Sequence, residues 1–238
     1  MVRILKAAVT TALLVAPMAQ ALQAESCLLV PSQSIELSSP VPGVVSRSEL
    51  ERGAQVTEGQ ILVRLDDRQD RATIALARAR MDFADRRIER NQTMLSQNLL
   101  ADQEADELQT ERALAELELK QAQSVASLKV IRSPITGWVL RVDRHKGEYV
   151  GTDPLAELIA LDPLKAELVF PARVLNQISV GDSVKLNIQF SDQPVSATID
   201  AIDPLVDPSS GTFGARATFA NPAGATRAGL RCELASSE

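Results

Sequence analysis

Between Asp70 and Ser127 the chain contains neither proline nor glycine, the two residues that most often interrupt a helix. Apolar residues recur there in steps that alternate between three and four positions, first along 74–95 and again along 101–126. This heptad pattern is typical of helices that pack against one another along a narrow seam. The two seams consist of Ile74, Ala77, Met81, Ala84, Ile88, Asn91 and Leu95, and of Ala101, Ala105, Leu108, Arg112, Ala115, Leu119, Ala122 and Ala126.

The numbering of the two seams predicts how the helices pair. If the chain reverses near residues 98–100, facing seam positions always have numbers that sum to 199 or 200, as for Ile74 with Ala126. The outer faces are densely charged, which favours a hairpin that projects into solvent over helices packed on another core. We therefore predict an antiparallel coiled-coil hairpin over residues 66–129, with arms roughly 40 Å long at 1.5 Å per residue.

The segments on either side of this hairpin repeat each other. Residues 39–45 read SPVPGVV and residues 133–139 read SPITGWV, 94 positions later, and the repeat continues with equally spaced glycines and valines. Short alternating runs bounded by turn residues predict strands in both halves. Neither half could bury its apolar face alone, so we predict one pseudo-symmetric β-sandwich formed by residues 35–65 and 130–160. Its structural glycines are Gly43, Gly53, Gly137 and Gly147.

The last third of the chain is expected to form a second β-rich domain. Apolar residues alternate with polar ones along 184–190, 195–199, 213–219 and 230–234. Four strands at this spacing, with one apolar face each, predict a small antiparallel barrel or sandwich within residues 161–235.

The N-terminus has the layout of a secretory signal peptide over residues 1–24. Arg3 and Lys6 precede a short apolar run, and small residues follow it. An uncleaved membrane anchor is the alternative, but the run is shorter than the roughly 20 residues that cross a bilayer. Cleavage leaves 23 basic against 31 acidic residues, a net charge of −8. We therefore expect an exported, acidic protein that does not bind nucleic acid, because phosphate contacts need Lys and Arg.

The only two cysteines, Cys27 and Cys232, lie near opposite ends of the mature chain. An oxidising compartment permits a disulfide between them, and the termini of a domain are often neighbours. The alternative is two buried free thiols, since Cys232 alternates with Leu230 and Leu234 on the apolar face of a predicted strand.

No motif predicts catalysis or a cofactor. The single histidine, His145, lies in the charged turn RVDRHKGE, without the apolar pocket and orienting carboxylate that a nucleophilic triad needs. Metal sites need several clustered His or Cys ligands, and the chain has few of either. A lipoyl or biotinyl carrier would need a lysine in the turn between the sandwich halves, where the helical segment begins LDDRQDR instead. We predict a protein that is not an enzyme.

Several motifs taken together resemble the periplasmic adaptor subunits, or membrane fusion proteins, of resistance-nodulation-division efflux pumps. They are PVPGVV with ERGAQVTEGQILVRLDD, the helical hairpin, VIRSPITGWVLRVDRHKGEYV, LDPLKAELVFPARVLNQISVGDSVKLNI, and IDPLVDPSSGTFGARATFANPAGATRAGLRCEL. The resemblance implies an α+β, mostly β fold: a lipoyl-like sandwich split by the hairpin, then a β-barrel of residues 25–34 and 161–235. It also implies that Cys27 lies beside Cys232. The membrane-proximal domain of longer members is not expected here.

The same resemblance implies a function carried by surfaces. In the family the hairpin tip contacts the outer-membrane channel, while barrel and sandwich contact the inner-membrane transporter, and copies assemble as a ring or with a second adaptor. Arg90 fits the tip motif, whereas Asn91, Met94 and Ala101 depart from its two leucines and its serine. The expected tip residues are Arg90, Met94, Leu95, Asn98, Leu99, Ala101 and Glu104. The alternative is a stand-alone periplasmic protein that binds a small ligand or metal ion and self-associates through its hairpin.

Overall fold

The computed structural model describes residues 23–235 apart from 98–100, 152 and 192. All but the last two residues of the predicted signal peptide lie outside the described residues. The chain divides into two compact units. One unit holds residues 29–165 and 219–229, and the other holds the remaining described residues. The division falls inside two long continuous strands, β1 (Ser26–Ser38) and β8 (Pro154–Pro171).

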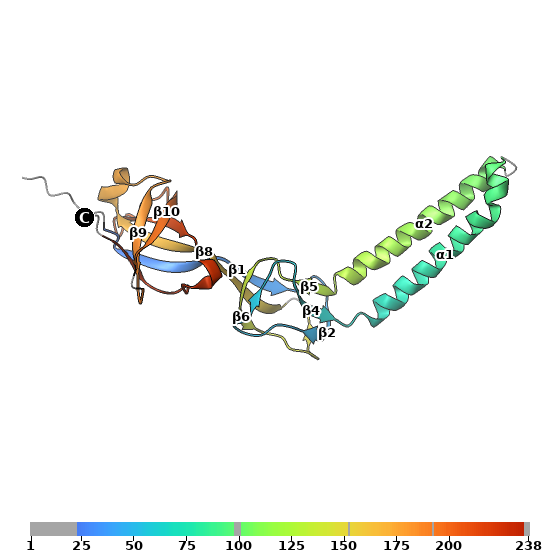
Figure 1. The fold of residues 1–238 in the computed structure, drawn as a ribbon, viewed down its shortest axis with the longest axis horizontal. Coiled ribbons are helices and arrows are strands. Elements are labelled where there is room, and N and C mark those ends of the chain that lie inside the picture. The colour runs from blue at the N-terminus through green and yellow to red at the C-terminus, as the bar shows by residue number, and fades with distance from the viewer. Residues whose placement is uncertain (1–22, 98–100, 152, 192, 236–238) are drawn as a thin grey trace, which may run out of the picture. The chain divides into compact units, whose positions relative to one another are not determined.

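Two long helices are inserted into the first unit. Strand β4 (Ile61–Leu65) leads into α1 (Arg68–Ser96), and α2 (Asp102–Ser127) leads into β5 (Val130–Arg132). Figure 1 shows α1 and α2 side by side along their length. Because β4 and β5 are antiparallel neighbours, the hairpin leaves and re-enters the same sheet.

We call this whole first unit the sandwich unit. Apart from the hairpin, it consists of two small sheets around an apolar core. One sheet has the order β5-β4-β2-β7, and the other contains β8, β6 and β3 as successive neighbours. The additional strands are β2 (Gly43–Ser48), β3 (Gln55–Val56), β6 (Gly137–Val142) and β7 (Tyr149–Val150). The core draws on both halves of the repeat, with Val45, Leu62 and Leu65 from the first and Ile131, Val139 and Val150 from the second.

The two copies of the repeat pair with each other across the sandwich. Gly43 of the first copy pairs with Val150 of the second, and Gly137 of the second pairs with Val56 of the first. Each residue of one pair lies 94 positions from its counterpart in the other. Each half therefore supplies a strand that pairs with a strand of the other half.

The four repeat glycines occupy two kinds of position. Gly53 and Gly147 have φ values of 83° and 92°, in the left-handed region that favours glycine. Gly53 N–H donates to Val139 O and Gly147 N–H donates to Val45 O, each over 2.8 Å. Gly43 and Gly137 instead sit at close approaches, because an added Cβ at Gly137 would lie 2.1 Å from a backbone oxygen of β8.

The second unit, which we call the barrel unit, contains the predicted alternating strands. They are β9 (Ser183–Ile188), β10 (Val195–Ile202), β11 (Thr212–Phe219) and β12 (Cys232–Leu234), with short helical turns at η1 (Ala172–Gln177) and, in the sandwich unit, η2 (Pro222–Gly224). The strand order is β12-β9-β10-β11-β8, and β1 pairs with β8. Phe170 and Phe213 stack in its core with ring centroids 5.8 Å apart.

One core prediction in this unit is wrong. The alternation that buries Val184, Leu186 and Ile188 predicts Phe190 on the same face. Phe190 is instead 89% exposed and has a φ of 66°. Strand β9 ends at Ile188, and Phe190 lies in the tight turn in which Ser191 N–H donates to Ile188 O, so the turn reverses the side-chain direction.

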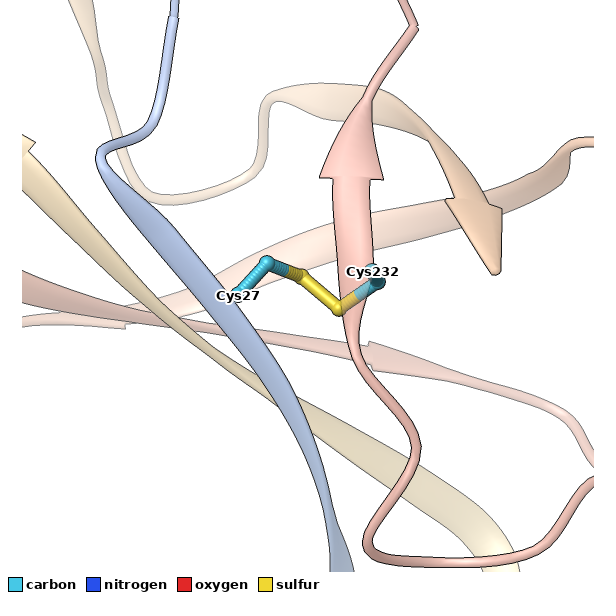
Figure 2. Close-up of a disulfide and its surroundings, with 2 residues drawn as sticks. All are labelled: Cys27 and Cys232. Carbon is cyan, nitrogen blue, oxygen red and sulfur yellow. A yellow bond between two sulfur atoms is a disulfide. The ribbon is translucent and has the colours of Figure 1, made fainter. Parts of the chain in front are cut away.

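A disulfide joins the first and last strands of the barrel unit. Cys27 on β1 and Cys232 on β12 are each 5% exposed, and their Cα atoms lie 4.9 Å apart (Figure 2). Beside them, Leu28 and Arg231 form an isolated antiparallel bridge. The disulfide and this bridge connect β1 to β12 and close the barrel. Of the two alternatives for the cysteines, the structure has the disulfide.

Candidate partner-binding site

The interface between the two hairpin helices follows the predicted seams. Its most buried residues are Ala77, Ala84, Leu108 and Ala115, each at most 7% exposed. Most of the other seam residues are half-buried, Arg112 among them. Alanines on both sides allow the helix backbones to approach closely, so the hairpin is a slender rod with little apolar surface inside it.

Ion pairs cross the seam and agree with the predicted register of the helices. Arg80 Nη1 lies 2.9 Å from Glu118 Oε2, and Arg87 pairs with Glu111. The seam position of Arg112 predicts an ion pair with Asp85 or Glu89, and the structure has Asp85, with Nε 2.9 Å from Oδ1. The hydrogen bond to Asp85 and its charge raise the pKa of Arg112. Partly exposed pairs of this kind each add little stability.

The base of the hairpin is held by one lysine. Lys129 Nζ donates to the backbone oxygen of Asp66 over 2.9 Å and forms an ion pair with Asp70, whose Oδ2 lies 3.0 Å away. Both charged side chains are at most 22% exposed. Lys129 therefore joins the end of α2 to the start of α1 where both meet the sandwich.

Asp66 organises the first turn of α1. Its carboxylate accepts hydrogen bonds from the Arg68 backbone N–H and guanidinium. The side-chain hydrogen bond from Arg68, followed by the backbone one, lowers the pKa of Asp66 from 3.8 to about 2. The same contact raises the pKa of Arg68.

The predicted tip residues lie where α1 ends and α2 begins. Arg90, Met94, Ala101 and Glu104 are exposed to solvent, with Met94 45% exposed. Leu95 belongs to the last turns of α1, while Asn98 and Leu99 lie outside the described residues. The described tip thus combines an arginine, an apolar side chain and a carboxylate, a set able to bind another protein surface.

Sequence reasoning missed a second surface on the sides of the hairpin. Leu76 and Phe83 on α1, and Leu114 and Leu117 on α2, are 49–60% exposed. An open groove of about 950 Å³ lies beside Phe83 and Leu114. The signal was available, because these apolar residues fall outside the heptad seams and so cannot be buried between the two helices.

The described residues offer little chemistry of other kinds. His145 is solvent-exposed, with its Nδ1 3.7 Å from Glu148 Oε1. Within 23–235 and its three gaps, no three His, Cys, Asp or Glu side chains gather as a metal-ligand set would. No helix in the described part of the chain is long and apolar enough to cross a membrane.

Comparisons with known proteins agree with this arrangement. Residues 166–238 match the family model of the CusB-like β-barrel domain found in resistance-nodulation-division systems. The cation efflux system protein CzcB of Alcaligenes sp. strain CT14 is 26% identical over 206 residues, covering 79% of this chain and 39% of CzcB. The solvent efflux pump periplasmic linker SrpA of Pseudomonas putida is 25% identical over 204 residues, covering 79% of this chain and 53% of SrpA. The chain thus spans about half or less of the length of these relatives.

Solved structures show the same fold. A MacA–MexA chimera that contains the Pseudomonas aeruginosa MexA α-hairpin domain superposes with a TM-score of 0.75 at 18% identity, covering 90% of this chain and 78% of the chimera. The membrane fusion protein Spr0693 from Streptococcus pneumoniae R6 gives a TM-score of 0.70 at 17% identity, covering 88% of this chain and 99% of Spr0693. Residues 166–238 are therefore of the CusB-like β-barrel type, and the chain is a relative of the periplasmic adaptor subunits, or membrane fusion proteins, of resistance-nodulation-division efflux pumps.

Proposed function

We propose that this protein is a non-catalytic periplasmic adaptor that links an inner-membrane efflux transporter to an outer-membrane channel in a tripartite export system. The observation that carries the proposal is the exposed helical hairpin, mounted on a sandwich that its own flanking segments complete. SrpA, which is named as an efflux pump periplasmic linker, and CzcB, which is named as a cation efflux system protein, support it. In this proposal the sandwich is lipoyl-like, the hairpin is a coiled coil, and several copies act together.

The tip of the hairpin is the proposed contact with the channel. Arg90, Met94 and Glu104 are exposed there, and none of them forms an ion pair with another residue in the described part of the hairpin. The barrel and sandwich units are the proposed contacts with the transporter. The barrel carries several exposed apolar side chains in its loops, Val180 at 64% and Leu205 at 74% among them.

Position-specific photocrosslinking in the periplasm of the native host tests the proposal. A crosslinker at Met94 or Glu104 should capture an outer-membrane channel, and one at Val180 or Leu205 should capture an inner-membrane transporter, each identified by mass spectrometry. A crosslinker at the exposed Gln123, near the base of α2, is the matched control for the tip. Capture of neither kind of partner, together with ligand binding by the purified monomer, would contradict the adaptor role.

A second experiment separates contact from folding. Replacing Leu95 and Leu99 with glutamate should abolish transport, measured as loss of resistance to exported compounds, while the far-ultraviolet circular dichroism stays unchanged. Loss of helix content in this variant would show that the two leucines are structural, and the channel contact would then have to lie elsewhere.

A further inference from the structure

The groove beside Phe83 and Leu114 combines apolar walls with an apolar floor. It has a volume of about 950 Å³, and the buried seam residue Ala115 also lines it. Phe83 of α1 is 49% exposed and Leu114 of α2 is 58% exposed. Because neither residue belongs to a heptad seam, their apolar surfaces do not hold the two helices together and are available to a ligand.

The charged side chains that line the groove are mostly acidic. Four carboxylates and one guanidinium lie along it, a net charge of −3. Two of the carboxylates are neutralised by arginines of α1, because Glu118 pairs with Arg80 and Glu111 pairs with Arg87. The other two carboxylates, on the same helix, carry the excess negative charge.

These two carboxylates belong to Asp106 and Glu107, near the start of α2. In the described part of the chain Asp106 forms no ion pair, and Glu107 only accepts a hydrogen bond from Gln103 Nε2 over 3.1 Å. Glu107 precedes Leu114 by seven residues, or about 10 Å at 1.5 Å per residue. The groove therefore has an apolar section and, closer to the hairpin tip, an uncompensated negative section.

We propose that this groove binds an amphiphilic organic cation, a small molecule with an apolar aromatic body and one positive charge. The body packs between Phe83 and Leu114, and the positive charge is attracted by Asp106 and Glu107. The face of a phenyl ring attracts cations as well. The volume suits a drug-sized ligand. The inference goes beyond the proposed function, which gives the hairpin contacts with proteins only.

A helix of a partner protein is the other occupant that a groove between two helices suggests. The ion pair of Arg80 with Glu118 disfavours it. Both residues also line the next hollow along the hairpin, so the pair lies between the two hollows. A helix lying along both would cover this half-exposed pair and remove its charges from water, which costs free energy. A small molecule that ends before the pair leaves it solvated.

Two ions of the same shape and opposite charge test the proposal. Tetraphenylphosphonium is a cation with an apolar aromatic body, and tetraphenylborate is its anionic counterpart. Equilibrium dialysis against the full chain purified from the periplasm should give a Kd at least tenfold lower for the phosphonium ion at low ionic strength. Added salt should weaken the binding of the phosphonium ion, because it screens the exposed carboxylates.

Substitutions in the groove separate its charge from its apolar surface. Asp106→Asn with Glu107→Gln removes both charges and keeps the size of the side chains. This variant should raise the Kd of the phosphonium ion at least tenfold and should bind the borate ion no more weakly than the original chain does. Leu114→Ala removes part of the apolar wall and should raise the Kd of the phosphonium ion at least fivefold.

Matched control variants lie on the same hairpin outside the groove. Asp82→Asn with Glu89→Gln removes two exposed carboxylates of α1, and Leu117→Ala truncates an exposed leucine of α2. None of these three residues lines the groove. Each control should change the Kd of the phosphonium ion less than threefold. Circular dichroism of every variant checks that the helices are intact.

The inference is overturned if the phosphonium ion does not bind, if both ions bind equally well, or if the control variants weaken binding as much as the groove variants do. Absence of binding together with a photocrosslink from Leu114 to a periplasmic protein would show that the groove is a protein-docking surface instead. The photocrosslinks from the tip and barrel decide the adaptor role separately. If those capture channel and transporter while the groove binds no cation, this inference fails and the adaptor role stands. If the groove binds the cation and neither partner is captured, the adaptor role fails and the cation site stands.

Discussion

Reduction of the Cys27–Cys232 disulfide should destabilise the barrel unit by an amount that depends on how much of the chain unfolds with it. The two cysteines are 205 positions apart in sequence. If the whole chain unfolds, a loop of that length corresponds to about 5 kcal/mol in the chain-entropy model. Strand β12 has only three residues, and apart from the bridge of Leu28 to Arg231 it pairs only with β9, so it depends heavily on this crosslink.

The expected effect is smaller when the barrel unit opens by itself. The Gly229 N–H donates to Leu29 O over 2.7 Å, and both residues belong to the sandwich unit. If the sandwich stays folded, the contact between Leu29 and Gly229 already holds these two segments of the chain together. The disulfide then closes a loop of only about seven residues. The same model then gives roughly 2 kcal/mol. The disulfide therefore contributes less to local opening of the barrel than to complete unfolding.

Hydrogen–deuterium exchange with mass spectrometry measures the opening of the barrel unit and that of the sandwich unit separately in one molecule. After reduction and alkylation, amides of β9 and β12 should exchange about 30-fold faster without denaturant, the rate equivalent of roughly 2 kcal/mol. Amides of β6 in the sandwich should change less than twofold under those conditions. The Cys27→Ser, Cys232→Ser double variant is the control for alkylation. An unchanged exchange rate in β9, or an equal acceleration in β6, would refute the reasoning.

Three further predictions concern the sandwich and the base of the hairpin. Gly137→Ala should lower the melting temperature of the sandwich, because the added Cβ would lie 2.1 Å from a backbone oxygen, and overpacking of this kind costs about 1–3 kcal/mol or more. In Gly43→Ala the added Cβ would meet only side-chain atoms, the nearest at 3.1 Å, so this variant should lose less stability. Equal decreases in melting temperature for the two variants would contradict this. Lys129→Met should cost about 1–3 kcal/mol in helix unfolding followed at 222 nm, since it leaves Asp70 partly buried without its cation, and Asp70→Asn in the same chain should recover part of the loss. The carboxyl of Asp66, followed by NMR, should titrate near pH 2. Because its pKa falls on folding from 3.8 to about 2, the stability that it contributes is complete above about pH 4 and disappears as the pH drops through 2. A titration midpoint near pH 4 would show that the contact with Arg68 is absent in solution.

Much of the sandwich unit could be predicted because its signals are periodic. The heptad steps of α1 and α2 identify the seam, and Ala77, Ala84, Leu108 and Ala115 are buried as expected. The repeat indicated one body built from two halves. It did not show that Gly43 pairs with Val150, because alternation determines which face a residue occupies and not which strand lies beside it.

The candidate site was predictable only in part. The tip residues came from a family resemblance, and of these Arg90, Met94, Ala101 and Glu104 are exposed in the structure. The exposed apolar residues outside the seams, Leu76, Phe83, Leu114 and Leu117, were missed because single exposed apolar side chains are common on proteins, although their positions off the heptad seams were visible in the sequence. Phe190 was misplaced for a local reason, since a turn of positive φ ends the alternation.

The way the hairpin is inserted has a consequence for how its length can vary. Its two ends join neighbouring strands, with Arg64 paired to Val130, and Lys129 fastens them at the sandwich. Removing seven residues from α1 and the seven residues of α2 that face them removes one heptad from each helix. This keeps the remaining seam positions opposite each other and leaves the junction with the sandwich unchanged. The arm is in effect a spacer whose reach can be trimmed or extended in steps of about 10 Å, seven residues at 1.5 Å each, without any change to the body that carries it.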